Sequence, residues 1–296
     1  MLKSYITLAV RSFRKNRVFS LVNVSGIGLS LAAFLFILEY ISFETSVDRF
    51  HQRLPDISRV IFESENQEYG DYSPGAMAPL LKERLAEVEG YCRVLPAETG
   101  KGIVSFTAGA GGQDRYSFRE EKAIYADAGL FQLFSLPLVT GAADLGKPNT
   151  VAISRSQALK YYQREEVTGN VISLNNQFGQ TPYTIVAVFE DLPANSTLQF
   201  DMVFSLQTLA NPANLNGNDW ADINGWESSF LTSYVLLDPR ADRLATEGRI
   251  QSLQKTIFPE SKDLPHLQAM AHVHLPDGLS DPYPTQGNLA FLYALG

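Results

Sequence analysis

Three histidines near the C-terminal end are the side chains whose spacing best suits chemistry. His266, His272 and His274 fall on one face of an alternating segment, and the other face carries Leu267, Ala269, Ala271, Val273 and Leu275. Successive side chains of a strand point to opposite faces, so the pattern predicts a half-buried strand over 267–275. Imidazoles two residues apart on one face could chelate a metal ion. No carboxylate is placed beside these histidines by its spacing in the sequence. The sequence therefore favours the interpretation that they are ordinary histidines on an outward strand face, and not metal ligands.

Other motifs give no support for catalysis. The glycine cluster at 108–112 lacks the Lys-Ser/Thr of a phosphate-binding loop, and no run matches GxGxxG, GxSxG or HExxH. The single cysteine, Cys92, excludes an intrachain disulfide and fits a buried small hydrophobe better than a reactive thiol. We therefore expect no catalytic residue, no metal ligand and no cofactor bound by this chain.

The composition indicates a folded protein of two parts. The 296 residues are 45% hydrophobic and 19% charged, which is enough apolar surface for a packed core. The net charge of −8 argues against nucleic acid as a partner, because phosphate recognition needs clustered basic residues.

The N-terminal segment predicts a membrane anchor. The first 17 residues hold five basic side chains and no acidic one, and residues 18–38 are uncharged. A helix over those 21 residues is about 32 Å long, which matches the hydrocarbon core of a bilayer. Clustered positive charge predicts a cytoplasmic N-terminus and a transmembrane helix over 18–42. A cleaved signal peptide is the rival interpretation, but the apolar run is longer than such peptides have and no small-x-small site follows it.

Two finer patterns concern the anchor and its flank. On a helical wheel, residues 1–17 separate into an apolar arc and a basic arc, as in a helix lying at the membrane interface; a simple basic flank that sets topology would show similar charges. The pairs Gly26/Ser30 and Gly28/Ala32 have the small-xxx-small spacing that lets a second helix approach closely.

Residues 43–288 predict a mixed α and β region outside the membrane. Apolar periodicity indicates helices near 75–89 and from 238 onward, the latter with Ile250, Leu253 and Ile257 on one face. Apolar runs at 183–189, 200–205 and 230–237 indicate strands, and 107–116 and 211–225 indicate loops. The fold class expected is therefore α+β, with one transmembrane helix before a mixed α/β domain outside the membrane; the resemblance described next implies that this domain is periplasmic and two-lobed.

Several local blocks resemble one family in order. They are 47–51 (VDRFH) with 57–60 (ISRV), 129–138 (GLFQLFSLPL) with Gly141, 149–162 (NTVAISRSQALKYY) with Gly169, 183–205 with 190–196 (EDLPANS), and 267–275. Together they resemble FtsX/MacB-type ABC transporter permeases and their MacB-like periplasmic core domain. Gln163 and Ala187 stand where the family usually has glycine, and Pro55 interrupts the segment after the first block, which predicts local turn changes.

The C-terminal end departs more strongly from that family. Its members continue into three more membrane helices, whereas this sequence ends at Gly296, and residues 289–296 resemble the start of a second membrane helix. Eight residues are too few to cross a bilayer, so we expect a fragment or a truncated subunit.

The resemblance implies a mechanotransmission role, in which a cytoplasmic ABC ATPase drives shape changes of a periplasmic domain that acts on peptides, antibiotics or lipoproteins. ATP would bind to that separate subunit, and the permease would be a homodimer or heterodimer in the membrane. The coupling candidates are Asp48, Arg49, Phe50, His51, Asp191 and Pro193. For Asp48 and Arg49, a helix cap with a salt bridge is the structural alternative. The resemblance divides the domain into a lobe of 56–119 with 200–288 and an inserted lobe of 120–199.

Two other function classes stay open. An anchored sensory or ligand-binding domain would share the anchor and the lobes but would need an output module inside the cell. An anchored hydrolase would show activity in the isolated domain, which we expect to be absent.

Overall fold

The computed structural model describes residues 5, 11, 15–108, 114–278 and 283–295. The chain divides into two compact units, one of Met1–Ser46 with Asn288–Gly296 and one of Val47–Gly287. The predicted interfacial helix over 1–17 lies mostly outside the described residues, and so does the tip of the predicted loop at 107–116.

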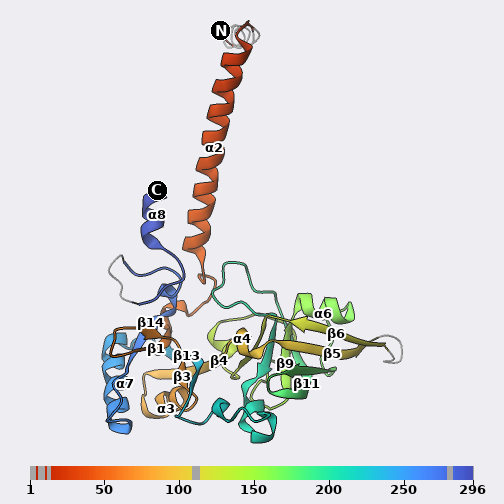
Figure 1. The fold of residues 1–296 in the computed structure, drawn as a ribbon, viewed down its shortest axis with the longest axis vertical. Helices are drawn as coiled ribbons and strands as arrows, with labels where there is room; N and C mark the ends of the chain where they lie inside the picture. Colours follow the sequence, from red (N-terminus) through yellow and green to blue (C-terminus); the bar gives the residue numbers. More distant parts are fainter. Residues whose placement is uncertain (1–4, 6–10, 12–14, 109–113, 279–282, 296) are drawn as a thin grey trace. The chain divides into compact units, whose positions relative to one another are not determined.

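Among its described residues, the first unit has one long apolar helix and a short one. Helix α2 (Arg17–Ser46) has no buried residue and is long and apolar enough to cross a membrane (Figure 1). It includes the predicted span and continues four residues beyond it. Helix α8 (Leu289–Leu295) begins after Asn288, whose side-chain oxygen accepts the N–H of Phe291 at 3.0 Å. The helix predicted to begin at 289 is therefore confirmed.

The second unit is built on one sheet, which has 14 strands among the described residues. The strands are β1 (Ile57–Glu63), β2 (Tyr69–Gly70), β3 (Ser73–Pro74), β4 (Val88–Leu95), β5 (Gly102–Ala108), β6 (Asp114–Glu120), β7 (Ala123–Ala126), β8 (Leu138–Gly141), β9 (Thr150–Ser154), β10 (Val171–Asn176), β11 (Gly179–Phe189), β12 (Met202–Ser205), β13 (Ser229–Leu237) and β14 (Leu264–Ala269). The helices are α3 (Met77–Arg84), α4 (Ala97–Gly100), α5 (Leu130–Leu133), α6 (Arg155–Tyr162) and α7 (Arg243–Ile257). Short 3₁₀ turns are η1 (Leu54–Asp56), η2 (Leu206–Ala210), η3 (Pro212–Asn214), η4 (Asp219–Ala221) and η5 (Met270–His272).

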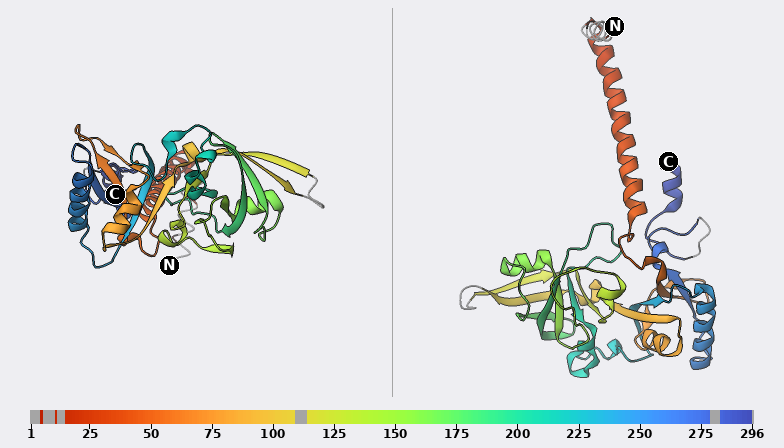
Figure 2. Two further views of the ribbon diagram at one scale, coloured as in Figure 1. Left: turned by 90° about the horizontal axis from the view of Figure 1, so that it is seen from below. Right: turned by 180° about the vertical axis from the view of Figure 1, so that it is seen from behind.

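The strand order along the sheet is β14-β1-β13-β4-β7-β12-β9-β11-β10-β5-β6. The pairs β7/β12 and β9/β11 are parallel, and the other neighbours along this order are antiparallel. Helix α7 lies at the β14 end, and the β5–β6 hairpin projects at the opposite end, with α6 nearby (Figures 1 and 2). This arrangement confirms a mixed α/β domain after one apolar helix.

Three apolar clusters support the sheet. One packs α3 and α7 against β1 and β13, and a second packs α6 against β5, β9, β10 and β11. The third gathers α5 with β4, β7 and β12. Each helix is short and amphipathic, so its stability comes mainly from burying one face on the sheet.

Three sequence-based boundaries are wrong. The helix predicted over 75–89 ends at Arg84, because Val88 already begins β4. The helix predicted from 238 begins at Arg243, where the Asp242 side chain caps it by accepting the N–H groups of Leu244 and Ala245. The strand predicted over 267–275 ends at Ala269, and the chain then turns into η5.

The sheet order also bears on the predicted lobes. Strands β5 and β6 fall within 56–119 except for the last residue of β6, yet they join the sheet through β10 of the predicted inserted lobe. Strand β12, predicted to belong to the first lobe, lies between β7 and β9. The division into two lobes stays a prediction, and any boundary that follows the strands must move these segments.

Candidate functional site

The segment that follows α2 is bound to two distant parts of the domain. We call Asp48, His51, Phe134, Asn195 and Thr197 the junction site. The backbone N–H of Asp48 donates to the Asn195 carbonyl oxygen at 2.9 Å, and the N–H of Thr197 donates to Asp48 Oδ1 at 2.8 Å. Asp48 is 1% exposed, so both hydrogen bonds are shielded from water. The predicted blocks at 47–51 and 190–196 therefore meet in space.

The backbone of Asp48 has an uncommon conformation. Its φ of 60° lies in the left-handed region, which Asp tolerates better than most residues with a Cβ. The turn is closed by the N–H of His51, which donates to the Asp48 carbonyl oxygen at 3.1 Å. The backbone carbonyl of Asp48 thus closes the turn after the helix, while its carboxylate makes the contact with Thr197.

His51 joins the same segment to the block at 129–138. Its Nδ1 lies 2.6 Å from the Phe134 carbonyl oxygen, which makes Nδ1–H the donor. Its ring meets that of Phe134 edge-on at 5.3 Å, and Phe134 in turn meets Tyr234 of β13 at 5.1 Å. Burial lowers the pKa of His51, and the contacts with Phe134 and Asp48 oppose this shift. Neutral His51 is therefore the form that the buried site favours.

Polar atoms in this region remain without hydrogen bonds among the described residues. They are Asp48 Oδ2, His51 Nε2, Ser196 Oγ and Thr197 Oγ1. His51 Nε2 lies 3.8 Å from Asp48 Oδ1, which is beyond hydrogen-bond distance. An incompletely satisfied polar cluster is costly in a packed interior.

The other two coupling candidates of the first block, Arg49 and Phe50, have more exposed side chains. Arg49 is exposed and makes no hydrogen bond or ion pair with any residue that the structure describes. Phe50 is 39% exposed, and its ring centroid lies 4.1 Å from that of His51. The structure therefore brings Asp48 and His51 into the site and leaves the side chain of Arg49 outside it.

The two candidates in the 190–196 block shape the loop. Asp191 accepts hydrogen bonds from the N–H and the hydroxyl of Ser156, at the start of α6. Burial acts to raise the pKa of Asp191, but these hydrogen bonds prevail and hold it below its ordinary value. The Pro193 carbonyl oxygen accepts the N–H of Ser196 at 3.1 Å, which closes the turn that presents Asn195 to Asp48.

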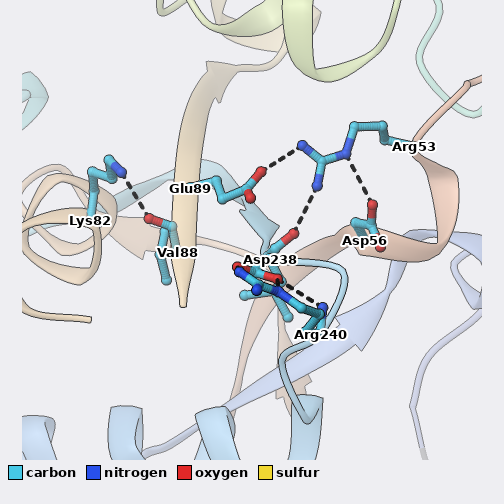
Figure 3. A network of polar contacts seen from close by, with 8 residues as sticks. Arg53, Asp56, Lys82, Val88, Glu89, Asp238 and Arg240 are labelled. Carbon is cyan, nitrogen blue, oxygen red and sulfur yellow. Dashed lines mark hydrogen bonds and ion pairs between the residues drawn. The ribbon is translucent and has the colours of Figure 1, made fainter. Parts of the chain in front are cut away.

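Arg53 fixes the segment to the β14 side of the domain. Its guanidinium donates to Asp56 at 3.0 Å, to Glu89 at 2.6 Å and to the Leu237 carbonyl oxygen at 3.1 Å (Figure 3). Glu89 belongs to β4 and Leu237 ends β13. The sequence offered no local signal for the contacts with Glu89 and Leu237, because these partners are 36 and 184 positions away.

A buried ion pair that the sequence analysis missed holds the centre of the sheet. Arg93 of β4 is 2% exposed and binds both carboxylate oxygens of Asp127, at 2.8 and 2.9 Å. It also donates to the Gly75 and Ile223 carbonyl oxygens. No sequence pattern marks Arg93 as a buried cation, because only the fold brings Asp127, Gly75 and Ile223 next to it.

The remaining candidates have structural surroundings. Cys92 is fully buried, and burial raises the pKa of its thiol well above the ordinary value, which confirms the prediction of a buried hydrophobe. His266 lies between Glu63 and Glu247, at 2.9 and 3.1 Å, while His272 belongs to η5, so the predicted shared strand face is wrong. The part of the chain that the structure describes holds no cluster of three or more His, Cys, Asp or Glu suited to a metal ion.

The small residues of α2 are open to a neighbour. A Cβ built on Gly26 or Gly28 meets no atom within 4 Å, and Ser30 donates its hydroxyl back to the Gly26 carbonyl oxygen at 2.9 Å. Ala32 completes the second small-xxx-small pair. Association through this face stays a prediction.

Comparisons with known proteins agree with this architecture. The profile of the MacB-like periplasmic core domain matches residues 20–253. A domain assigned to a permease protein from Porphyromonas gingivalis is 21% identical with a TM-score of 0.58, covering 83% of this chain and 99% of that one. The periplasmic region of MacB from Actinobacillus actinomycetemcomitans is 13% identical with a TM-score of 0.50, covering 79% of this chain and 94% of that one. No curated protein sequence matches the chain.

Proposed function

The chain belongs to the family of the MacB-like periplasmic core domain, and from that membership we propose that it is the permease subunit, or the N-terminal part of one, of a mechanotransmission ABC transporter. Domains of this family are those of ABC transporter permeases, which are not enzymes in themselves. In the proposal, α2 spans the inner membrane with residues 1–17 in the cytoplasm, and residues 47–287 work in the periplasm.

The junction site is the observation that supports coupling. Only Val47 separates Ser46, the last residue of α2, from the buried Asp48. Any displacement of the helix end is therefore applied to a residue that is hydrogen-bonded to Asn195 and Thr197, and through His51 to Phe134. Short buried hydrogen bonds do not stretch, so the 195–197 loop and the segment after α5 would move with the helix end.

The partners follow from the same proposal. A cytoplasmic ABC ATPase binds ATP and supplies the work, and the permease assembles as a homodimer or heterodimer through its membrane helices. The domain then acts on peptides, antibiotics or lipoproteins outside the membrane. Residues of this chain bind no cofactor in the proposal, and the net charge of −8 argues against nucleic acid as a partner.

The test has two stages. The tagged protein is purified from native membranes in mild detergent, and mass spectrometry identifies its companions; an ATPase with Walker motifs is expected. Protease sensitivity of residues 47–287 is then compared with and without ATP and vanadate. We expect an ATP-dependent cleavage pattern in the wild type and its loss in Asp48→Ala, with ATP hydrolysis retained. A chain that co-purifies with no ATPase would instead indicate an anchored sensory or ligand-binding domain.

A further inference from the structure

An aromatic groove lies at the β5–β6 end of the domain, away from the junction site. Its volume is about 680 Å³, which is sufficient for a small organic ligand. Its walls are the rings of Phe106, Tyr116, Phe118, Tyr161 and Tyr162. Phe106 stacks on Tyr116 with centroids 5.6 Å apart and planes 23° apart, and Tyr116 is 42% exposed. The groove therefore presents flat apolar faces on which a planar ring can stack.

The charges along the groove have one sign. Lys160 and Arg164 line it, and no acidic residue is among the described residues that do. Lys160 is already engaged, because its Nζ lies 2.7 Å from Glu120 Oε1 and 4.9 Å from the centroid of Phe118. Arg164 is exposed and forms no ion pair within the described ranges. In a chain of net charge −8, Arg164 is thus a cation available to a ligand.

Two buried polar groups of the groove need a partner. The Tyr162 hydroxyl and Asn170 Nδ2 have no hydrogen bond among the described residues. The Asn170 amide nitrogen is a donor, and the guanidinium of Arg164 can only donate. Burial raises the pKa of Tyr162 while the charge of Arg164 opposes the rise, so the hydroxyl also stays protonated and able to donate. The groove thus presents hydrogen-bond donors and requires acceptors from its occupant.

We infer that this groove binds a small planar aromatic anion, whose ring stacks on Tyr116 and Tyr162 and whose carboxylate, sulfonate or phosphate group pairs with Arg164 and Asn170. Charge-assisted hydrogen bonds to a guanidinium are the strong kind, and removal of one costs about tenfold in affinity or more. The inference does not depend on an ATPase partner, and it goes beyond the proposed function.

The experiment uses the full chain in a zwitterionic detergent. Naphthalene-2-carboxylate is titrated by isothermal calorimetry, with empty micelles as the blank, and neutral naphthalene-2-carboxamide is the matched probe. We expect saturable binding of the carboxylate at one site and weaker binding of the carboxamide. Arg164→Gln should weaken carboxylate binding about tenfold or more and leave carboxamide binding unchanged. Tyr116→Ala should weaken both.

Arg84→Gln on α3 is the matched control, because it removes the same charge from an exposed position outside the groove. Circular dichroism verifies that each variant is folded; if Tyr116→Ala is not, Tyr116→Leu takes its place. No saturable carboxylate binding above the micelle blank, or equal affinities of the wild type and Arg164→Gln, would overturn the inference. An equal loss in Arg84→Gln would also overturn it, since net charge alone would then explain the affinity.

Discussion

The carboxylate of Asp48 accepts the backbone N–H of Thr197 at 2.8 Å, across 149 positions of sequence. This hydrogen bond connects Asp48, two residues after the end of α2, with the loop that follows β11. Because it lies beside the point where the chain leaves α2, position 48 is the most direct place to test mechanical coupling.

Asp48→Ala should destabilise the domain by about 2 kcal/mol, because it removes a buried charge-assisted hydrogen bond at a left-handed residue. Asp48→Asn keeps an acceptor and tolerates the same φ, so it should cost less than half as much. Urea unfolding of the full chain in detergent measures both. Arg49→Ala is the exposed neighbour control and should change the stability by less than about 0.5 kcal/mol. Equal losses in the alanine variants at 48 and 49 would contradict this role.

His51 should make stability depend on pH. Its folded pKa lies below the unfolded value of about 6.5, so between these two values the unfolded chain binds more protons. The contribution of His51 is therefore complete above pH 6.5 and is lost as the pH falls from there toward the folded pKa. Melting temperatures measured from pH 7.5 to 5 should drop less in His51→Gln than in the wild type. His274→Gln serves as the control, and an unchanged slope in His51→Gln would refute the assignment.

Arg93→Met should cost about 3–5 kcal/mol, because it leaves Asp127 buried without its cation and removes donors from the Gly75 and Ile223 carbonyls. Chemical denaturation provides the measurement. The double variant with Asp127→Leu should recover part of the loss, since no charge then stays unpaired. Arg84→Met, at an exposed site, should be nearly neutral.

Gln163→Gly should stabilise the domain by about 0.5 kcal/mol. Gln163 ends α6 with φ 56°, a left-handed conformation in which glycine carries no Cβ strain, although glycine also loosens the unfolded chain. Gln163→Val should destabilise the domain, because a β-branched residue is poorly tolerated there. Thermal unfolding compares the stability of the wild type, Gln163→Gly and Gln163→Val. A glycine variant less stable than the wild type, with a valine variant more stable, would show that φ does not control stability at this position.

Gly28→Leu should weaken association of α2 with other membrane helices. A Cβ at position 28 has no described atom of another part of the chain within 4 Å, so we expect any loss to arise between chains. Crosslinking in membranes, with Leu29→Ala as a control on a different face, measures the effect. Unchanged crosslinking in Gly28→Leu would contradict a role of this pair.

Local patterns predicted much of the fold. An uncharged apolar run of 21 residues has few structural options, so α2 follows from hydropathy alone. The boundaries of β11, β12 and β13 were predicted to within four, two and one residues, because β-branched and aromatic runs bounded by turn residues are a local signal. The blocks that resemble the permease family were equally readable; the profile match over 20–253 confirms the family and covers every block except the one at 267–275.

Where local signals compete, the sequence misled. The alternation over 267–275 continues past the real end of β14 at Ala269, because pairing with β1 reaches only Ser58. Likewise, Leu85 and Val88 suit a helical stripe, yet Val88 pairs with Leu237 of β13. In both places the partner strand decided the boundary, and a partner more than 100 positions away leaves no local trace.

The sequence by itself determined the long apolar helix and the mixed α/β class, and its resemblance to the permease family selected Asp48 and His51 as candidates, since each depends on composition or on local blocks. Only the tertiary structure decided what those residues contact, that Arg49 is not among the contacts, and that Arg93 joins Asp127 at the centre of the sheet. It also decided that α6 and the β5–β6 hairpin enclose an aromatic groove. The physical reason is that burial and hydrogen bonding are properties of neighbours in space, which chain folding brings together from positions that no pattern along the sequence connects.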